Sequence, residues 1–185
     1  HGLVGKRGST ITNQLSKWAN QINYRIDWRL LNSNDFGVAQ NRKRIFIIGV
    51  TGRTTDKDRI LPIFSPLTGT ESGSTIRDKI FDLQGDTSKI TIPNHVHANL
   101  VPINIERLQH IRPGQGRNAL PDHLRLPTQK RHVNNGHSET YGRLEWDEPA
   151  PTLTTSFHSI SKGRFGHPTE TRGLTLREGA RLQGF

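Results

Sequence analysis

Residues 36–49, Phe-Gly-Val-Ala-Gln-Asn-Arg-Lys-Arg-Ile-Phe-Ile-Ile-Gly, are the stretch around which the rest of the chain is organised. A polar segment with Gln40, Arg42 and Arg44 runs directly into an apolar run. Because apolar and polar residues do not alternate in that run, it predicts a strand covered on both faces. If the extended backbone starts by Arg42, Arg42 and Arg44 leave on the same face and Lys43 points away. The stretch therefore predicts long polar side chains at the mouth of a buried strand, which suits recognition of an anion or a base.

The composition indicates a basic protein with many loops. The 185 residues include 26 Lys and Arg against 16 Asp and Glu, a formal net charge of +10, together with 18 Gly and 10 Pro. Such a charge is typical of a polyanion binder, although a basic soluble protein without that role is the alternative. The absence of cysteine excludes disulfides, thiolate metal sites and a cysteine nucleophile within this sequence. Without a membrane-spanning run or a signal pattern, we expect a soluble, intracellular protein.

The residues before this stretch predict a helix followed by a strand. Ile11, Leu15, Trp18 and Ile22 are spaced by four, three and four residues, which places them on one face of a helix over residues 10–22, capped by Ser9 or Thr10. Residues 24–30 then alternate between apolar and polar, the period of a strand with one buried face. A helix, a strand, a loop and a second strand look like the closing edge of an α/β sheet. If the rest of that sheet lies elsewhere, the apolar faces of residues 45–50 lack partners.

The remainder of the chain predicts short elements separated by loops. One capped helix is expected over residues 74–83 and another over residues 103–111, with little regular structure over residues 85–101. A third helix is expected to open at Thr175, because Glu178 follows at the spacing of a capping box.

Positive charge is concentrated between residues 106 and 137, where glycines and prolines favour loops. Loops can follow a duplex while their side chains reach phosphates and base edges, so we expect DNA contacts here. The candidate DNA-binding residues of this segment are Arg107, Arg112, Arg117, Arg125, Lys130 and Arg131. The alternative is a solvated basic loop.

Thr152 and Thr154 are further candidates for DNA binding. The prolines that precede them fix an extended backbone, so both hydroxyls point one way and Leu153 points the other. Hydroxyls on an extended edge can bond phosphate oxygens, but most such threonines only satisfy neighbouring backbone groups.

Three stretches in order resemble the DNA (cytosine-5) methyltransferase family. Residues 35–49 resemble its motif eight, Gln-x-Arg-x-Arg followed by an apolar strand. Residues 143–155 resemble the Arg-x-x-x-x-x-Pro-x-x-Thr-x-Thr segment that precedes motif nine, and residues 172–185 resemble motif nine itself. Residues 53–140 correspond only by position to the family's target recognition region.

The resemblance implies an α/β fold in two parts. Residues 1–52 would be the carboxy-terminal part of the catalytic domain, a helix plus an antiparallel strand pair from the edge of a Rossmann-like methyltransferase sheet. Residues 53–185 would be a small, irregular α+β target recognition domain with motif nine. The family's Pro-Cys nucleophile, its Phe-x-Gly-x-Gly loop and its Glu-Asn-Val acid are not among these residues. Since the chain also begins at His1 and has no Met, we expect a fragment, a processed piece or one half of a split protein.

The resemblance also implies a reaction: transfer of a methyl group from S-adenosyl-L-methionine to C5 of a flipped cytosine in a specific duplex site. The implied catalytic residues here are Arg44 beside the base, Arg42 as its partner at the active-site wall, and Gln40. The expected partners are double-stranded DNA and an amino-terminal catalytic half that binds the cofactor, so the chain alone should be inactive. A restriction-modification system is expected, in the cytoplasm and nucleoid of a prokaryote, with a cognate restriction endonuclease as a further candidate partner.

Other interpretations are possible. The whole could be a DNA-binding module of this family that never methylates, or a generic basic RNA-binding protein. His95 and His97 could share one face of a strand as metal ligands, but no Cys or carboxylate pair completes the site. Trp146 could stack on a base, although a packing role is the simpler interpretation.

Overall fold

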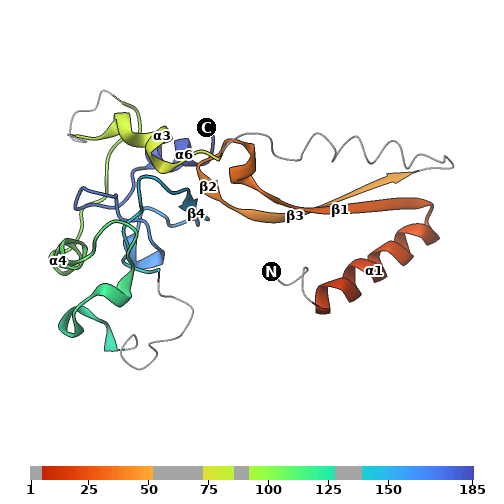
Figure 1. The fold of residues 1–185 in the computed structure, drawn as a ribbon, viewed down its shortest axis with the longest axis horizontal. Helices are drawn as coiled ribbons and strands as arrows, with labels where there is room; N and C mark the ends of the chain where they lie inside the picture. Colours follow the sequence, from red (N-terminus) through yellow and green to blue (C-terminus); the bar gives the residue numbers. More distant parts are fainter. Residues whose placement is uncertain (1–5, 52–72, 86–91, 128–138) are drawn as a thin grey trace.

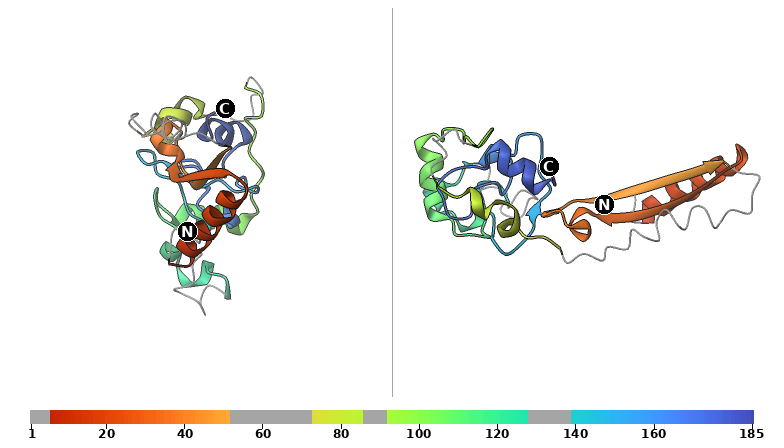
Figure 2. Two further views of the ribbon diagram at one scale, coloured as in Figure 1. Left: turned by 90° about the vertical axis from the view of Figure 1, so that its right-hand side faces the viewer. Right: turned by 90° about the horizontal axis from the view of Figure 1, so that it is seen from above.

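A computed structural model describes residues 6–51, 73–85, 92–127 and 139–185. A long two-stranded hairpin with one helix beside it extends from a rounded part that contains the other helices (Figure 1). Figure 2 shows from two further directions that the helix runs alongside the hairpin and not over the rounded part.

The extension consists of α1 (Lys6–Gln21), β1 (Tyr24–Asn32) and β3 (Lys43–Thr51). β1 and β3 are antiparallel, with Tyr24 opposite Thr51 and Asn32 opposite Lys43, so the predicted antiparallel strand pair is confirmed. The predicted start of the helix was wrong, because Ser9 and Thr10 lie inside α1. Serine and threonine inside a helix cost less than about 1 kcal/mol each, so they need not fix its start.

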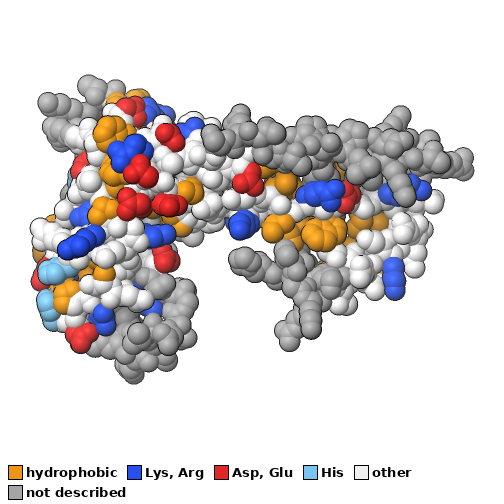
Figure 3. Space-filling view, in the orientation of Figure 1, with side chains coloured by type: hydrophobic (Ala, Val, Ile, Leu, Met, Phe, Trp, Pro, Cys, Tyr) orange, Lys and Arg blue, Asp and Glu red, His pale blue; other side chains and the backbone are white. Residues whose placement is uncertain are grey.

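The hairpin is not covered on both faces by the described residues. Phe46 and Ile47 of β3 are 50% and 42% exposed, and Trp18 and Ile22 of α1 are 56% and 66% exposed. Figure 3 shows hydrophobic side chains along this extension. One helix can cover only one face of a two-stranded ribbon, so the expectation of a strand buried on both faces is not met in this chain alone.

The rounded part contains three short α-helices that lie wholly within its described residues, and several 3₁₀ turns. The α-helices are α3 (Ile76–Ile80), α4 (Pro102–His110) and α6 (Leu176–Leu182). The 3₁₀ turns here are η3 (Phe81–Leu83), η4 (Arg117–Ala119), η5 (Asp122–Leu124) and η6 (Ile160–Lys162). The three predicted helices are confirmed, and the capping box of Thr175 with Glu178 is present.

Two apolar clusters stabilise the rounded part. One joins α3 and α6 around Trp146, Leu174 and Leu182, and the other joins α4 to the turns around Leu120 and Leu124. Arg143 lies buried between them, and its guanidinium donates to the carbonyls of residues on both sides, including Leu108, Ile111 and His167. Burial lowers the pKa of Arg143, yet the carbonyl oxygens satisfy its donors.

The two parts meet at a short parallel pairing. After the 3₁₀ turn η1 (Ser33–Phe36), β2 (Gln40–Asn41) pairs with β4 (Ala150–Pro151). The residues that resemble motif eight are thereby joined to those that precede the motif-nine-like stretch. In the part of the chain that the structure describes, no helix is long and apolar enough to cross a membrane.

Candidate functional site

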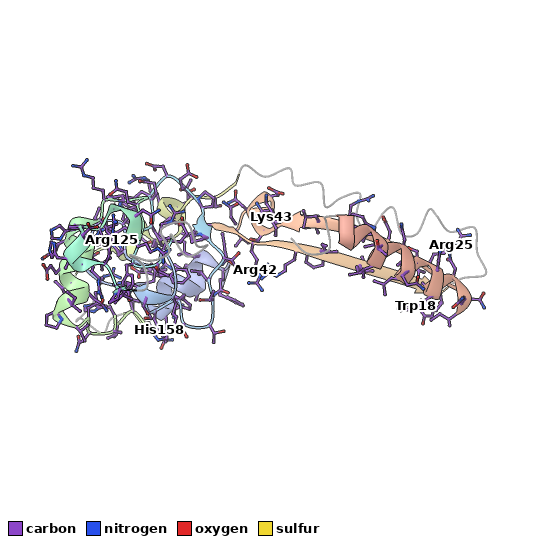
Figure 4. All side chains as sticks on the ribbon, turned by 90° about the horizontal axis from the view of Figure 1, so that it is seen from below. Trp18, Arg25, Arg42, Lys43, Arg125 and His158 are labelled. Carbon is purple, nitrogen blue, oxygen red and sulfur yellow. The ribbon has the colours of Figure 1, made fainter. Side chains whose placement is uncertain are left out.

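A groove of about 760 Å³ lies where the hairpin meets the rounded part. It collects residues from three regions of the chain: the stretch from η1 to β3, the segment after β4, and the residues that follow α6. Figure 4 shows Arg42 at this junction. The described residues that line the groove are Ser33, Val38, Gln40, Arg42, Arg44, Thr152, Leu153, Thr154, Thr155, Phe157, Gln183 and Phe185.

Three consecutive carbonyls fix the backbone that carries Gln40 and Arg42. The Ala39 carbonyl accepts from the backbone N–H of Ala150 at 3.0 Å. The hydroxyl of Ser33 donates to the Gln40 carbonyl, and the Thr152 hydroxyl donates to the Asn41 carbonyl at 2.8 Å. The start of the polar stretch is therefore held from both sides, which limits how far its side chains can shift.

Arg42 and Arg44 both line the groove, whereas Lys43 between them does not. Both arginines are exposed, and Nη1 of Arg44 donates to the Lys43 carbonyl at 2.7 Å. Within the described ranges, neither arginine forms an ion pair with a carboxylate, including the nearby Asp35. Two guanidiniums that face one groove without a carboxylate beside them attract an anion.

Gln40 is the buried member of this stretch, with 2% of its surface exposed. Its Oε1 atom has no hydrogen-bond donor among the residues that the structure describes. Because an unpaired buried amide oxygen is costly, this atom is a candidate for a contact made only in the complete complex.

The threonines of the segment after β4 differ from one another. Leu153 is buried and Thr154 is exposed in the groove, as the alternation predicts. Thr152 uses its hydroxyl proton on Asn41, so it cannot also donate to a phosphate. The predicted phosphate contact therefore rests on Thr154, and Thr152 has the backbone-satisfying role considered as its alternative.

The basic segment is less uniform than the sequence suggests. Arg107 is buried, donates to the Leu124 carbonyl at 2.9 Å and to Asn104, and lies over the ring of Tyr141. Arg117 is also buried.

These placements remove Arg107 and Arg117 from a surface that DNA could reach, which corrects the expectation for both. An arginine can satisfy its donors on carbonyls in the fold as readily as on phosphates, and sequence alone does not distinguish the two uses.

The other predicted DNA-binding residues of the basic segment differ in their exposure and in their contacts. Arg112 is exposed. Arg125 is half-buried, pairs with Asp122 at 3.1 Å and donates to the Asn118 carbonyl. Figure 4 shows Arg125 on the rounded part. Lys130 and Arg131 lie outside the described residues.

Sequence reasoning missed several residues of the groove, and four of them come from the carboxy-terminal part of the chain: Thr155, Phe157, Gln183 and Phe185. All four belong to the second and third stretches of the family resemblance or follow them closely. The only sequence signal for these four residues was the fixed order of those stretches. That order indicates that the stretches come together in the fold, but it does not identify the side chains that meet.

The alternative sites are used by the fold. His95 is buried, and its ring nitrogens contact the Thr175 hydroxyl at 3.1 Å and the Leu83 carbonyl at 2.8 Å. Among the described residues no cluster of His, Cys, Asp or Glu could hold a metal ion. Trp146 is 6% exposed and packs against Phe81 and His167, so it has the packing role and not the stacking role.

Comparisons with known proteins point in one direction. A family model described as C-5 cytosine-specific DNA methylase matches residues 1–185. The type II methylase M.HgiDII of Herpetosiphon aurantiacus is 31% identical over 188 residues, which cover 97% of this chain and 49% of that protein. The type II methyltransferase M.BbvI of Brevibacillus brevis is 32% identical over 183 residues, covering 98% and 45%.

One solved structure adds evidence for the fold. It is a DNA modification methyltransferase encoded within a prophage of E. coli, similar with a TM-score of 0.58 and 20% identity over 100% of this chain and 56% of that one. This likeness is consistent with a methyltransferase fold, of which the described residues form a mixed α/β part with small sheets.

A mixed α/β protein is suited to hold a polyanion where two arginines, without an ion-pair partner among the described residues, line a groove at its junction. With a family match over its whole length, this chain belongs to the C-5 cytosine-specific DNA methylases. It spans about half the length of the curated relatives that it matches.

Proposed function

We propose that this chain is the DNA-gripping and base-positioning part of a DNA cytosine-5 methyltransferase, which methylates C5 of a flipped cytosine in a specific duplex site. The observation that carries the proposal is the convergence of Arg42, Arg44 and Thr154 on one groove. A nucleotide swung out of its stack offers a phosphate and the O2 acceptor of cytosine, and both suit guanidinium donors.

In this proposal Arg44 contacts the extruded base and Arg42 the wall or flanking phosphate of the site. Gln40 supplies the unpaired Oε1 atom for a donor in the complete complex. The exposed Arg112 and the half-buried Arg125, with Lys130 and Arg131, remain proposed duplex contacts.

The methyl donor does not fit this groove. S-adenosyl-L-methionine carries a positively charged sulfonium, and the described residues that line the groove include Arg42 and Arg44 but no Asp or Glu. Like charges repel, so we assign the cofactor to the amino-terminal half, together with the nucleophile. That assignment makes the present chain inactive alone.

The extension is the proposed contact surface for that amino-terminal half. An apolar groove of about 380 Å³ lies between α1 and the hairpin, lined by Leu15, Trp18, Ala19, Ile22, Tyr24, Ile26 and Ile47. Trp18, Ile22 and Phe46 on the same extension are each at least half exposed, and a gathering of exposed apolar side chains is typical of an interface. Residues 1–52 would complete the edge of the catalytic sheet, and residues 53–185 would form the recognition domain.

Restoration of activity tests the proposal. This chain, co-expressed with a polypeptide that carries the missing motifs, should transfer a tritiated methyl group to duplex DNA, and neither part alone should do so. Duplex binding without any methyl transfer in the mixture would favour a non-catalytic, sequence-specific DNA-binding module instead.

The two bacterial relatives are a type II methylase and a type II methyltransferase. They support a proposal that this enzyme protects a site in a restriction-modification system of a prokaryotic cytoplasm. A cognate endonuclease that cuts the same unmethylated site is the further partner in that proposal.

A further inference from the structure

Helix α6 contains a glycine where helix stability alone would favour alanine. Gly179 lies in the middle of Leu176–Leu182 and is buried. Glycine in a helix interior is less favourable than alanine, because it loses more backbone freedom on folding. A contact with a neighbouring group must therefore require that position 179 has no side chain.

That contact is with the ring of Phe157. A Cβ atom on Gly179 would overlap ring carbons Cε2 and Cζ of Phe157, so the ring lies directly against the helix backbone. Phe157 also packs against the core cluster that contains Leu182, and it lines the groove. The absence of a side chain at Gly179 is thus what admits the ring.

A short segment between β4 and Phe157 is fixed at both ends. At its start, β4 pairs with β2 and the Thr152 hydroxyl donates to the Asn41 carbonyl. At its end, the ring of Phe157 lies against Gly179, and the N–H of Phe157 donates to the Thr154 carbonyl at 3.1 Å, which closes a turn. Thr154 and Thr155 lie between these two points, exposed and lining the groove.

We propose that Phe157, seated on Gly179, is a positioning residue that holds the Thr154 and Thr155 hydroxyls where they contact the DNA backbone. This inference rests on the proposed function, because it deepens the DNA-binding role of the same groove. It goes beyond that role in assigning the geometry of the threonines to an aromatic side chain and a helix glycine.

A double-mutant cycle in the assembled enzyme, this chain with its amino-terminal half, tests the inference. Phe157→Ala should raise the KM for duplex DNA roughly tenfold, the equivalent of one lost hydrogen bond to a charged group, and change kcat little. The KM of Phe157→Leu should lie between those of the wild type and Phe157→Ala, because leucine keeps part of the apolar contact. Leu120→Ala, a core variant outside the groove, should lower Tm without raising that KM.

Gly179→Ala separates positioning from simple stability. In the wild-type background the added Cβ displaces the ring, so Tm should fall and KM should rise. In the Phe157→Ala background the same change fills vacated space and improves the helix, so Tm should rise while KM stays high. A restored KM in the double variant, or an unchanged KM in Phe157→Ala, would overturn the inference.

The cycle also distinguishes this inference from the proposed function. If the assembled wild-type enzyme transfers no methyl group, the proposed function fails, and duplex affinity measured by fluorescence anisotropy replaces KM in the same comparison. If methyl transfer is normal and Gly179→Ala raises Tm in both backgrounds, the positioning role alone fails.

Discussion

Arg172 and Glu178 form a buried, two-pronged ion pair. Nη1 of Arg172 donates to Oε2 of Glu178 at 2.8 Å, and Nη2 donates to Oε1 at 2.7 Å, with both side chains almost fully buried. The same carboxylate accepts the backbone N–H of Thr175 and so caps α6. One side chain thus joins the loop before α6 to the start of that helix.

Removing the charge from this pair should be strongly destabilising. Glu178→Gln removes the buried carboxylate and leaves Arg172 with the less buried Glu170 as its remaining charged partner. The loss should approach the roughly 3–5 kcal/mol that breaking a buried ion pair costs. The free energy of unfolding from urea titration measures it. The exposed pair of Arg77 and Asp147, 2.7 Å apart, provides the control, and Asp147→Asn should change stability little. Equal losses in the two variants would contradict the assignment.

His167 should make stability depend on pH. Burial, and after it the nearby positive charge of Arg172, lowers the pKa of His167 from 6.5 to about 4, while Glu178 and Glu170 only partly oppose this. Between these values the unfolded chain binds a proton that the folded chain does not, so the free energy of unfolding decreases as pH falls from about 6.5 to 4. The full effect is roughly 3 kcal/mol.

The variant His167→Asn isolates this contribution. An amide oxygen can replace Nδ1, which accepts from the backbone N–H groups of Thr169 and Glu170. The variant should lose less stability than the wild type over the same pH range, measured as Tm at half-unit steps. Parallel curves for the two proteins would show that other groups cause the dependence.

Arg44→Ala should depress methyl transfer more than duplex binding. Base flipping costs a few kcal/mol, which a contact to the extruded base helps to offset, so the loss falls on the reaction and not on the initial complex. Arg44→Lys should rescue only in part, because an ammonium lacks the planar two-pronged geometry. Lys43→Ala, outside the groove lining, is the matched control. Equal and small losses in turnover and binding would remove Arg44 from the catalytic assignment.

Alanine in place of Arg112 should change DNA binding and not stability, whereas alanine in place of Arg107 should change stability. Arg112 is exposed, so Arg112→Ala should leave Tm unchanged and reduce the slope of log affinity against log salt by about 0.9 if it neutralises one phosphate. Arg107→Ala should cost roughly 1–3 kcal/mol of stability, because it removes buried hydrogen bonds to Leu124 and Asn104. Anisotropy titrations at several salt concentrations and a urea titration measure the two effects. A changed salt slope with normal stability for Arg107→Ala would reverse the assignment.

Local sequence patterns predicted the elements well because their causes are local. The spacing of Ile11, Leu15 and Trp18 in α1, the alternation in β1 and the Thr175–Glu178 capping box each depend on neighbours within a few residues. The placement of Arg42 and Arg44 on one side, away from Lys43, also follows from the period of an extended chain.

The use of each arginine and the composition of the groove could not be predicted in this way. Whether Arg107 meets a carbonyl or a phosphate depends on Leu124, seventeen residues away and brought close only by the fold. The contact of the Phe157 ring with Gly179 likewise depends on the fold, because no local sequence pattern relates these two positions.

The pairing of β2 with β4 has a consequence for the order of synthesis. Thr152 and Asn41, which hold that pairing, are 111 residues apart in the chain. At translation rates of about 5–20 residues per second, Asn41 waits roughly 6–22 s before Thr152 is made. Arg42 and Arg44 are therefore synthesised long before the segment after β4 that completes their groove, so a nascent chain that stops short of residue 150 cannot form this groove.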